Sequence, residues 1–154
     1  MLDSRRNWRE STKPLMSVER TFSIIKPDAV ADGHAGEILA AIQKAGFKPL
    51  ALRMTRLTPA QAQGFYAVHS AKPFFAGLVK FMTEGPIIVM ALEREDAIKG
   101  LREVMGATNP ANAAEGTIRK RFAASIERNC IHGSDAPETA AVELGFFFSA
   151  SELL

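Results

Sequence analysis

The sequence predicts an α/β domain in which helices cover a sheet, and two observations lead to this class. Residues 21–25 and 87–92 are apolar runs of the kind that form buried strands, whereas residues 38–45 repeat apolar side chains at helical spacing. Segments of these two kinds follow one another in the order strand, helix, strand, helix pair, strand, helix, strand, helix. This alternation predicts helices packed on a sheet, but it does not give the order of the strands.

The first strand is expected at residues 21–25, which alternate and then run apolar before Lys26. Residues 87–92 are the most continuously apolar stretch of the chain, so they are predicted to form a buried inner strand. A short strand is expected near residues 130–131, directly before His132. The strands thus place a lysine and a histidine at strand ends.

The remaining strand is predicted over residues 47–57, with Leu50, Leu52 and Met54 on one face because side chains alternate along a strand. A helix precedes it over residues 38–45, and Gly46 stands where a C-terminal cap is expected.

Three further helices are expected in the middle of the chain. The run Thr58-Pro59-Ala60-Gln61 combines an N-cap threonine, a proline in the first turn and a capping-box glutamine, so a helix carrying Tyr66 and His69 on one face should follow. Pro73 is expected to begin a helix that aligns Phe74, Leu78 and Met82, and residues 97–104 to form the next one.

A long loop and two helices complete the prediction. Residues 106–116 contain asparagines, a proline and glycines, which indicates a loop of functional size rather than a short connector. A short helix is expected over residues 117–124. Asp135, with Glu138 three positions later, is expected to begin the last helix.

Composition narrows the classes of function. The 154 residues are enough for one compact domain, and a net charge of +2 is too small to make nucleic acid the main partner. Cys130 is the only cysteine, no Cys or His spacing suits a metal, and no apolar run approaches the ~20 residues of a membrane span. We therefore expect a cytoplasmic protein.

Residues 1–16 are predicted to be a disordered or nonessential extension, and residues 17–154 the domain itself. The extension has no apolar periodicity and no hydrophobic region of a secretion signal. A mitochondrial transit sequence is the weaker alternative, supported only by a few arginines.

The run Asn129-Cys130-Ile131-His132-Gly133-Ser134-Asp135 carries the most chemical information. Imidazole is a nucleophile that is largely unprotonated near neutral pH, so His132 is a candidate for a displacement reaction. The alternative for a single histidine is a hydrogen-bonded structural role.

Five other motifs precede this run along the chain. They are Ile24-Ile25-Lys26-Pro27-Asp28, Phe65-Tyr66, Pro73-Phe74-Phe75, Ala107-Thr108-Asn109-Pro110 and Gly116-Thr117-Ile118-Arg119. Because of these motifs and the histidine run, the chain resembles the nucleoside diphosphate kinase family over residues 18–148. The resemblance implies a ferredoxin-like sandwich with a four-stranded antiparallel sheet, and a homo-oligomer, tetramer or hexamer, built from dimers.

The resemblance also implies a reaction. His132 would take the γ-phosphoryl group of a nucleoside triphosphate, typically ATP, and pass it to a nucleoside diphosphate in a ping-pong mechanism. Glu143 would hydrogen-bond the ring nitrogen that does not react, and Ser134 and Tyr66 would supply hydroxyl groups near the histidine. Ser134 has the alternative role of a helix cap.

Cationic and polar side chains would bind the phosphates and the sugar. Lys26, Arg102 and Arg119 are expected on phosphate oxygens, with Lys26 also on the ribose, although Arg102 alone would be read as a solvated residue. The resemblance implies that Thr108 donates to a phosphate and that Asn129 bonds the sugar hydroxyls, whereas a role in turns is the alternative for both.

The base would lie between Phe74 with Leu78 on one side and Ile126 on the other. Helical spacing alone would instead assign Phe74 and Leu78 to the core. Stacking of this kind discriminates weakly between bases, so broad nucleotide tolerance is expected.

The metal is expected to be Mg²⁺ carried mainly by the nucleotide phosphates, with no dedicated protein site and with Asp135 at most reaching it through water. His69 is a candidate phosphate contact. Two other classes of function are alternatives. A nucleic-acid-binding module would carry an aromatic pair on an inner strand, which this chain lacks, and an inactive scaffold would have lost His132, Lys26 or Arg119, all of which are present.

Overall fold

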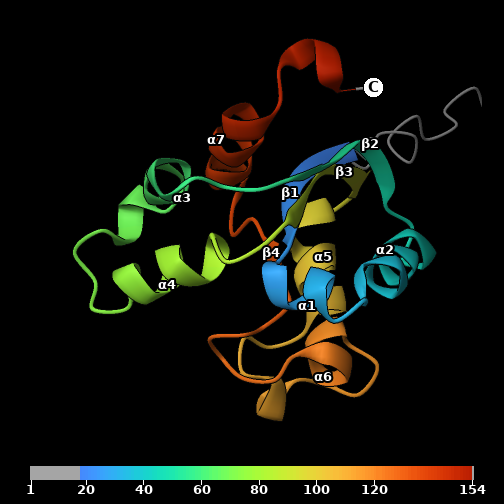
Figure 1. Cartoon of the computed structure of the whole chain (residues 1–154). Coiled ribbons are helices and arrows are strands. Elements are labelled where there is room, and N and C mark those ends of the chain that lie inside the picture. The colour runs from blue at the N-terminus through green and yellow to red at the C-terminus, as the bar shows by residue number, and fades with distance from the viewer. Residues whose placement is uncertain (1–17, 154) are drawn as a thin grey trace, which may run out of the picture.

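The computed structural model describes residues 18–153 and contains one four-stranded sheet in the order β2-β3-β1-β4. The strands are β1 (Val18–Ile25), β2 (Lys48–Thr55), β3 (Ile87–Glu95) and β4 (Ile131–Gly133). Every neighbouring pair is antiparallel, which confirms the predicted fold class (Figure 1). The predicted extension over residues 1–16 lies outside the described residues.

The helices follow the predicted order, with short additions. The α-helices are α1 (Pro27–Ala31), α2 (Ala35–Lys44), α3 (Pro59–Phe65), α4 (Phe75–Met82), α5 (Ala97–Met105), α6 (Ile118–Phe122) and α7 (Pro137–Phe147). The 3₁₀ turns are η2 (Ala67–His69), η3 (Pro110–Asn112) and η4 (Ala150–Glu152). Within residues 18–153 we find no helix with the length and apolar character that crossing a bilayer requires.

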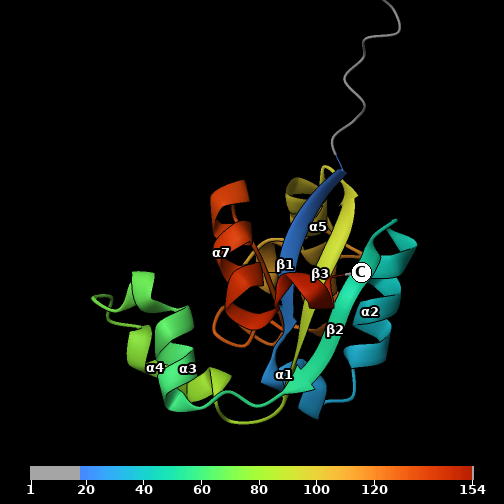
Figure 2. The ribbon, with the colours of Figure 1, turned by 90° about the horizontal axis from the view of Figure 1, so that it is seen from above.

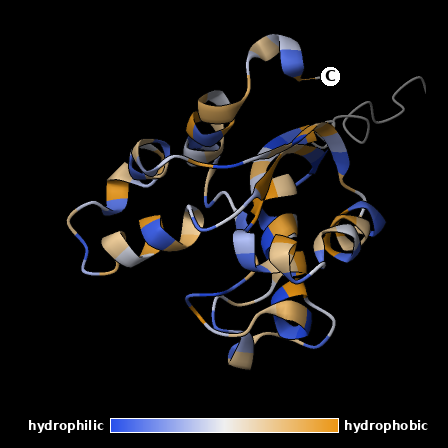
Figure 3. Ribbon diagram, viewed as in Figure 1, coloured by the Kyte–Doolittle hydropathy of each residue, from blue (hydrophilic) through white to orange (hydrophobic). Residues whose placement is uncertain are grey.

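Two apolar cores lie on opposite faces of the sheet, because successive side chains of β1 and β3 point to opposite sides. Phe22 and Val89 belong to the core that also contains residues of α3, α4 and α7. Ile25 and Met90 belong to the core with residues of α1, α2, α5 and α6. Seen from above, α7 and α2 flank the sheet on its two sides (Figure 2). Hydrophobic residues dominate the middle of the sheet, and the surrounding helices are mixed (Figure 3).

The prediction that Leu50, Leu52 and Met54 share one face of β2 is wrong. The pairing of β2 with β3 shifts between Pro49 and Ala51, so Leu50 is an extra, bulged residue. A bulge reverses the alternation that follows it. Leu50 is therefore buried in the core beneath α7, whereas Leu52 and Met54 are exposed.

The predicted helix carrying Tyr66 and His69 ends earlier than expected. Thr58 and Gln61 form the predicted capping box, but α3 stops at Phe65 and Tyr66 is its C-cap. His69 lies in the 3₁₀ turn η2, so it does not share a helix face with Tyr66. A glycine at position 64 in the last turn weakens the helix there.

Two smaller boundaries also differ from the prediction. Helix α4 begins at Phe75, and Phe74 is its N-cap rather than a residue within it. Asp135 does not begin the last helix: Ala136 is the N-cap, Pro137 occupies the first turn, and the Thr139 hydroxyl accepts from the Ala136 N–H at 3.0 Å. Asp135 instead binds an arginine at the site described below.

Candidate active site

His132 lies in the centre of the short edge strand β4. Its neighbour across the ladder is Ile24 of β1, and the hydroxyl of Ser23 donates to the His132 carbonyl at 2.7 Å. The backbone of the histidine is thus held by the sheet on one side, while its side chain is partly exposed. A rigid strand is a suitable support for a reacting group.

A carboxylate on α7 holds one nitrogen of the imidazole ring. Glu143 Oε1 lies 2.5 Å from His132 Nε2, and the Ser134 hydroxyl donates to the same oxygen at 3.0 Å. Ser134 is buried and also accepts from the Phe22 N–H at 3.3 Å, which ties the group to β1. With Nε2 occupied by Glu143, Nδ1 is the nitrogen left for chemistry.

Tyr66 is buried close to the histidine but does not bond it. Its ring meets the imidazole edge to face at a centroid distance of 6.5 Å. The hydroxyl has no hydrogen-bond partner among the described residues. Burial, and secondarily the charge of Glu143, raises the pKa of Tyr66 above its ordinary value, so the phenol stays protonated and able to donate.

One cavity of about 250 Å³ collects most of the predicted catalytic and phosphate-binding residues. His132, Tyr66, Glu143, Arg102, Thr108 and Arg119 all line it, together with His69 and Asp135. These side chains come from α5, α6, α7, β4 and the connecting loops, so only the fold brings them together. A histidine with two guanidinium groups around a small cavity suits a phosphoryl group.

Arg119 is held by backbone carbonyls. Its Nε donates to Asn129 O at 3.3 Å, its Nη1 to Gly106 O at 3.0 Å and its Nη2 to Ile131 O at 2.8 Å. A guanidinium has five N–H groups, and these three bonds use one on each nitrogen. One N–H therefore remains on Nη1 and one on Nη2, which is enough for a bidentate contact with an anion. Burial, followed by the charge of Arg102, lowers the pKa of Arg119 to about 10, so it remains charged at neutral pH.

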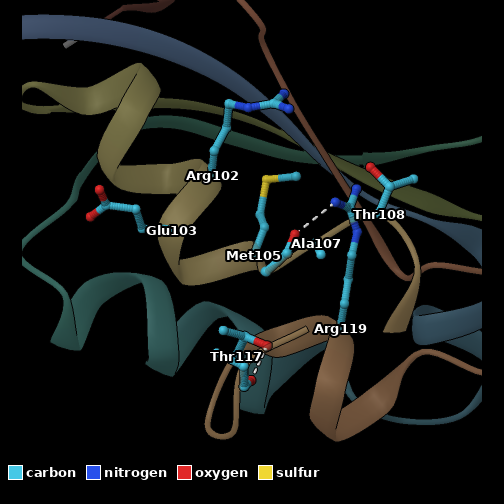
Figure 4. A pocket seen from close by; sticks show the side chains of 9 residues that line it. Arg102, Glu103, Met105, Ala107, Thr108, Thr117 and Arg119 are labelled. Atoms are coloured by element: carbon cyan, nitrogen blue, oxygen red, sulfur yellow. Dashed lines mark hydrogen bonds between the residues drawn. The ribbon is translucent and has the colours of Figure 1, made fainter. Parts of the chain in front are cut away.

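A second cavity, of about 340 Å³, adjoins the first and shares Arg102, Met105, Thr108 and Arg119 with it. Its labelled side chains come from α5, from the loop at positions 107–108, and from Thr117 and Arg119 at the start of α6, and a dashed line marks the bond from Arg119 to the Gly106 carbonyl (Figure 4). Part of the predicted loop over residues 106–116 therefore forms a wall of this cavity.

Lys26 and Asn129 form a buried pair that lines neither cavity, but the Asn129 carbonyl accepts from Arg119, which lines both. The Lys26 ammonium donates to Asn129 Oδ1 at 2.8 Å, and the Asn129 amide donates to the Ile126 carbonyl at 2.9 Å. Burial, and next the charge of Arg119, lowers the pKa of Lys26 to about 8, although Asp28 and Cys130 oppose this shift. Lys26 therefore loses its proton at a lower pH than an ordinary lysine does.

Arg102 and Asp135 form an ion pair at the open edge of the cavity. Arg102 Nη1 bonds Asp135 Oδ1, and both side chains are largely exposed. Both residues also line the cavity that contains His132.

Comparisons with known proteins show the family of this chain. A family model described as nucleoside diphosphate kinase matches residues 19–153. The nucleoside diphosphate kinase of Nitratidesulfovibrio vulgaris (strain DP4) is 61% identical over 137 residues, which cover 89% of this chain and 99% of that protein. The chain belongs to the nucleoside diphosphate kinase family.

Solved structures of the family agree with this assignment. The Aquifex aeolicus nucleoside diphosphate kinase is 45% identical, has a TM-score of 0.88, and is matched over 90% of this chain and 100% of its own. The halophilic nucleoside diphosphate kinase of Halobacterium salinarum, in complex with CDP, is 39% identical with a TM-score of 0.86, over 90% of this chain and 92% of that one. The enzyme therefore transfers phosphate between nucleoside tri- and diphosphates through a phosphohistidine, as nucleoside diphosphate kinases do.

The predicted base-binding residues of this family member lie outside both cavities described above. Phe74 and Ile126 are about half exposed, at 53% and 50%. Leu78 is partly buried against the core beneath α3 and α4, so it serves packing as well. The centroids of the Phe74 and His69 rings lie 5.5 Å apart.

The sequence reasoning missed two supports of this nucleoside diphosphate kinase site. Asp28 is buried, and its Oδ2 accepts from the Cys130 N–H at 3.1 Å. Cys130 adopts a positive φ of 73°, a conformation that favours glycine, and its carbonyl accepts from the Lys26 N–H at 2.8 Å. Neither feature has a sequence signal beyond the Lys-Pro-Asp motif, because backbone strain is a product of the tertiary contacts.

Proposed function

We propose that His132 is the phosphorylated residue and that it reacts through Nδ1. The observation that supports this most is the short contact between His132 Nε2 and Glu143, which leaves Nδ1 with its lone pair. Nδ1 attacks the γ-phosphorus of a nucleoside triphosphate, the bond to the β-phosphate oxygen breaks, and the diphosphate leaves. A second diphosphate then attacks phosphorus, and the N–P bond breaks.

Glu143 and Ser134 position the ring rather than react. The carboxylate holds the proton on Nε2 and stabilises the positive charge that the ring gains when Nδ1 bonds phosphorus. The Ser134 hydroxyl fixes the carboxylate. The unpaired Tyr66 hydroxyl, buried beside the ring, is free to donate to a phosphate oxygen.

Lys26, Arg102, Arg119 and Thr108 meet the phosphate charge in this proposal. The two N–H groups left on Arg119 provide a bidentate contact, and Arg102 exchanges Asp135 for phosphate as the nucleotide enters. Asn129 orients Lys26 by accepting its hydrogen bond, and it would bond the sugar hydroxyls. An anion beside Lys26 would raise its lowered pKa and keep it charged.

Phe74, Leu78 and Ile126 would contact the base, and His69 is a candidate phosphate contact because it lines the same cavity as His132. Contacts of this apolar kind support transfer among purine and pyrimidine nucleotides alike.

We infer that Mg²⁺ enters with the nucleotide phosphates. The exposed Asp135 carboxylate that lines the cavity is a hard oxygen donor and fits a hydrated Mg²⁺, which keeps several waters when it binds. The ion would neutralise phosphate charge when bound.

Labelling tests the nucleophile. Wild-type protein incubated with γ-labelled ATP should carry an acid-labile, base-stable label on His132, and His132→Ala should carry none and lose transfer while remaining folded. His34→Ala is the matched control, because His34 packs against Phe122 outside the cavity and should keep full labelling. Turnover above a few per cent of wild type in His132→Ala would exclude His132.

We also propose that the protein is a homo-oligomer, a tetramer or hexamer built from dimers. Strand β2 is an edge strand, and it exposes Leu52 and Met54, at 46% and 59%, on one side. An exposed edge with apolar side chains favours pairing with a second copy. Leu52→Lys should lower the molar mass measured by light scattering, and an unchanged mass would exclude this edge. The cytoplasmic location stays a prediction, to be checked by cell fractionation.

A further inference from the structure

Phe65, the last residue of α3, lines the same cavity as His132 but has no role in the mechanism above. It is half-buried, between the core and the cavity. Its ring packs on Phe22 and Phe147 of the core, at centroid distances of 5.6 and 5.3 Å. The core therefore holds the position of the ring, while part of the ring faces the cavity.

The Phe65 ring meets the imidazole of His132 edge to face. The two centroids are 5.6 Å apart and the planes make an angle of 74°, the arrangement that aromatic pairs prefer. Phe22 and Tyr66 bound the imidazole at 6.0 and 6.5 Å. Among the described residues these three rings surround the nucleophile, and Phe65 is the nearest of them.

A single hydrogen bond does not define the orientation of a histidine ring. Rotation about the Cβ–Cγ bond of histidine is broad and roughly two-fold, so Glu143 alone leaves the ring free to rock about the Nε2 contact. Such rocking moves Nδ1, and small displacements of a nucleophile from the line of attack are costly. A wall against the ring removes this freedom.

We propose that Phe65 is a positioning residue that holds the His132 imidazole so that Nδ1 points at the entering phosphorus. This proposal rests on His132 being the nucleophile. Phe65 acts on the rate of transfer to and from the histidine, and it does not bind the nucleotide. Glu143 sets which nitrogen reacts, and Phe65 sets where that nitrogen points.

The test is single-turnover phosphorylation by γ-labelled ATP over a range of ATP concentrations. Phe65→Ala should lower the maximal rate by at least about tenfold, because misplacement of a reacting group carries penalties of that order. The half-saturating ATP concentration should stay at the wild-type value. Phe65→Leu keeps apolar volume and so protects the fold. Its maximal rate should lie between those of the wild type and Phe65→Ala.

The matched control is Phe146→Ala. Phe146 contacts Phe65 at 5.5 Å, is 43% exposed, and does not line the cavity. It should keep the wild-type rate. Nitrogen-15 NMR should show the same protonated nitrogen of His132 in the wild type and in Phe65→Ala, because the contact with Glu143 remains.

The outcomes separate cleanly. Three results would each overturn the role of Phe65. They are wild-type maximal rates in both Phe65 variants, a loss of maximal rate in Phe146→Ala equal to that in Phe65→Ala, and a change confined to the half-saturating ATP concentration. Failure of the proposed nucleophile has a different result, because the wild-type protein itself would then carry no label on His132.

Discussion

Replacement of Glu143 by alanine tests how the histidine is prepared for reaction. The carboxylate lies 2.5 Å from His132 Nε2 and receives the Ser134 hydroxyl at 3.0 Å, and the histidine and glutamate side chains are only 20% and 16% exposed. A hydrogen bond to a charged group at such a site is worth about 1.5–3 kcal/mol. The ring becomes positive as Nδ1 bonds phosphorus, so most of this energy favours the transition state over the free enzyme.

Since about 1.4 kcal/mol corresponds to a factor of ten in rate, Glu143→Ala should lower kcat by about 10- to 100-fold. A coupled assay with saturating ATP and a diphosphate acceptor measures this change. Glu138→Ala is the control, because Glu138 is exposed in the first turn of the same helix and away from the ring. A Glu143→Ala variant with at least half of the wild-type kcat would show that the contact does not serve the chemistry.

Three other predictions follow from the same site. Because the pKa of Lys26 is lowered to about 8, its charge is lost as the pH rises through that value, so kcat/KM should fall above pH 8 and this limb should be absent in Lys26→Gln; a limb that persists in the variant would assign it to another group. Phe74→Ala should weaken nucleotide binding by roughly 1–3 kcal/mol, about equally for purines and pyrimidines, in titration calorimetry, and a loss for one base alone would indicate hydrogen-bonded base readout. Cys130→Val should destabilise the fold more than Cys130→Ala in urea unfolding despite its closer volume, because a β-branched side chain is strained at a φ of 73°; the reverse order would mean that packing outweighs backbone strain.

The helices and strands could be predicted wherever one local pattern dominates. The apolar run at 87–92 became the inner strand β3, and the capping box at Thr58 begins α3 as expected. Errors arose where a tertiary contact changes the pattern. The bulge at Leu50 sends Leu52 and Met54 to the opposite face, and a bulge leaves no trace in the alternation of residue types.

The family, the reaction and the candidate histidine could be predicted from the sequence alone, because the run from Asn129 to Asp135 and the five other motifs lie in one order along the chain. Only the tertiary structure decided which nitrogen of His132 is free, how the donors of Arg119 are divided, and that Phe65 lies against the imidazole ring. These properties depend on distances between residues far apart in the chain. Packing of the two cores against the sheet sets those distances, and no local pattern encodes them.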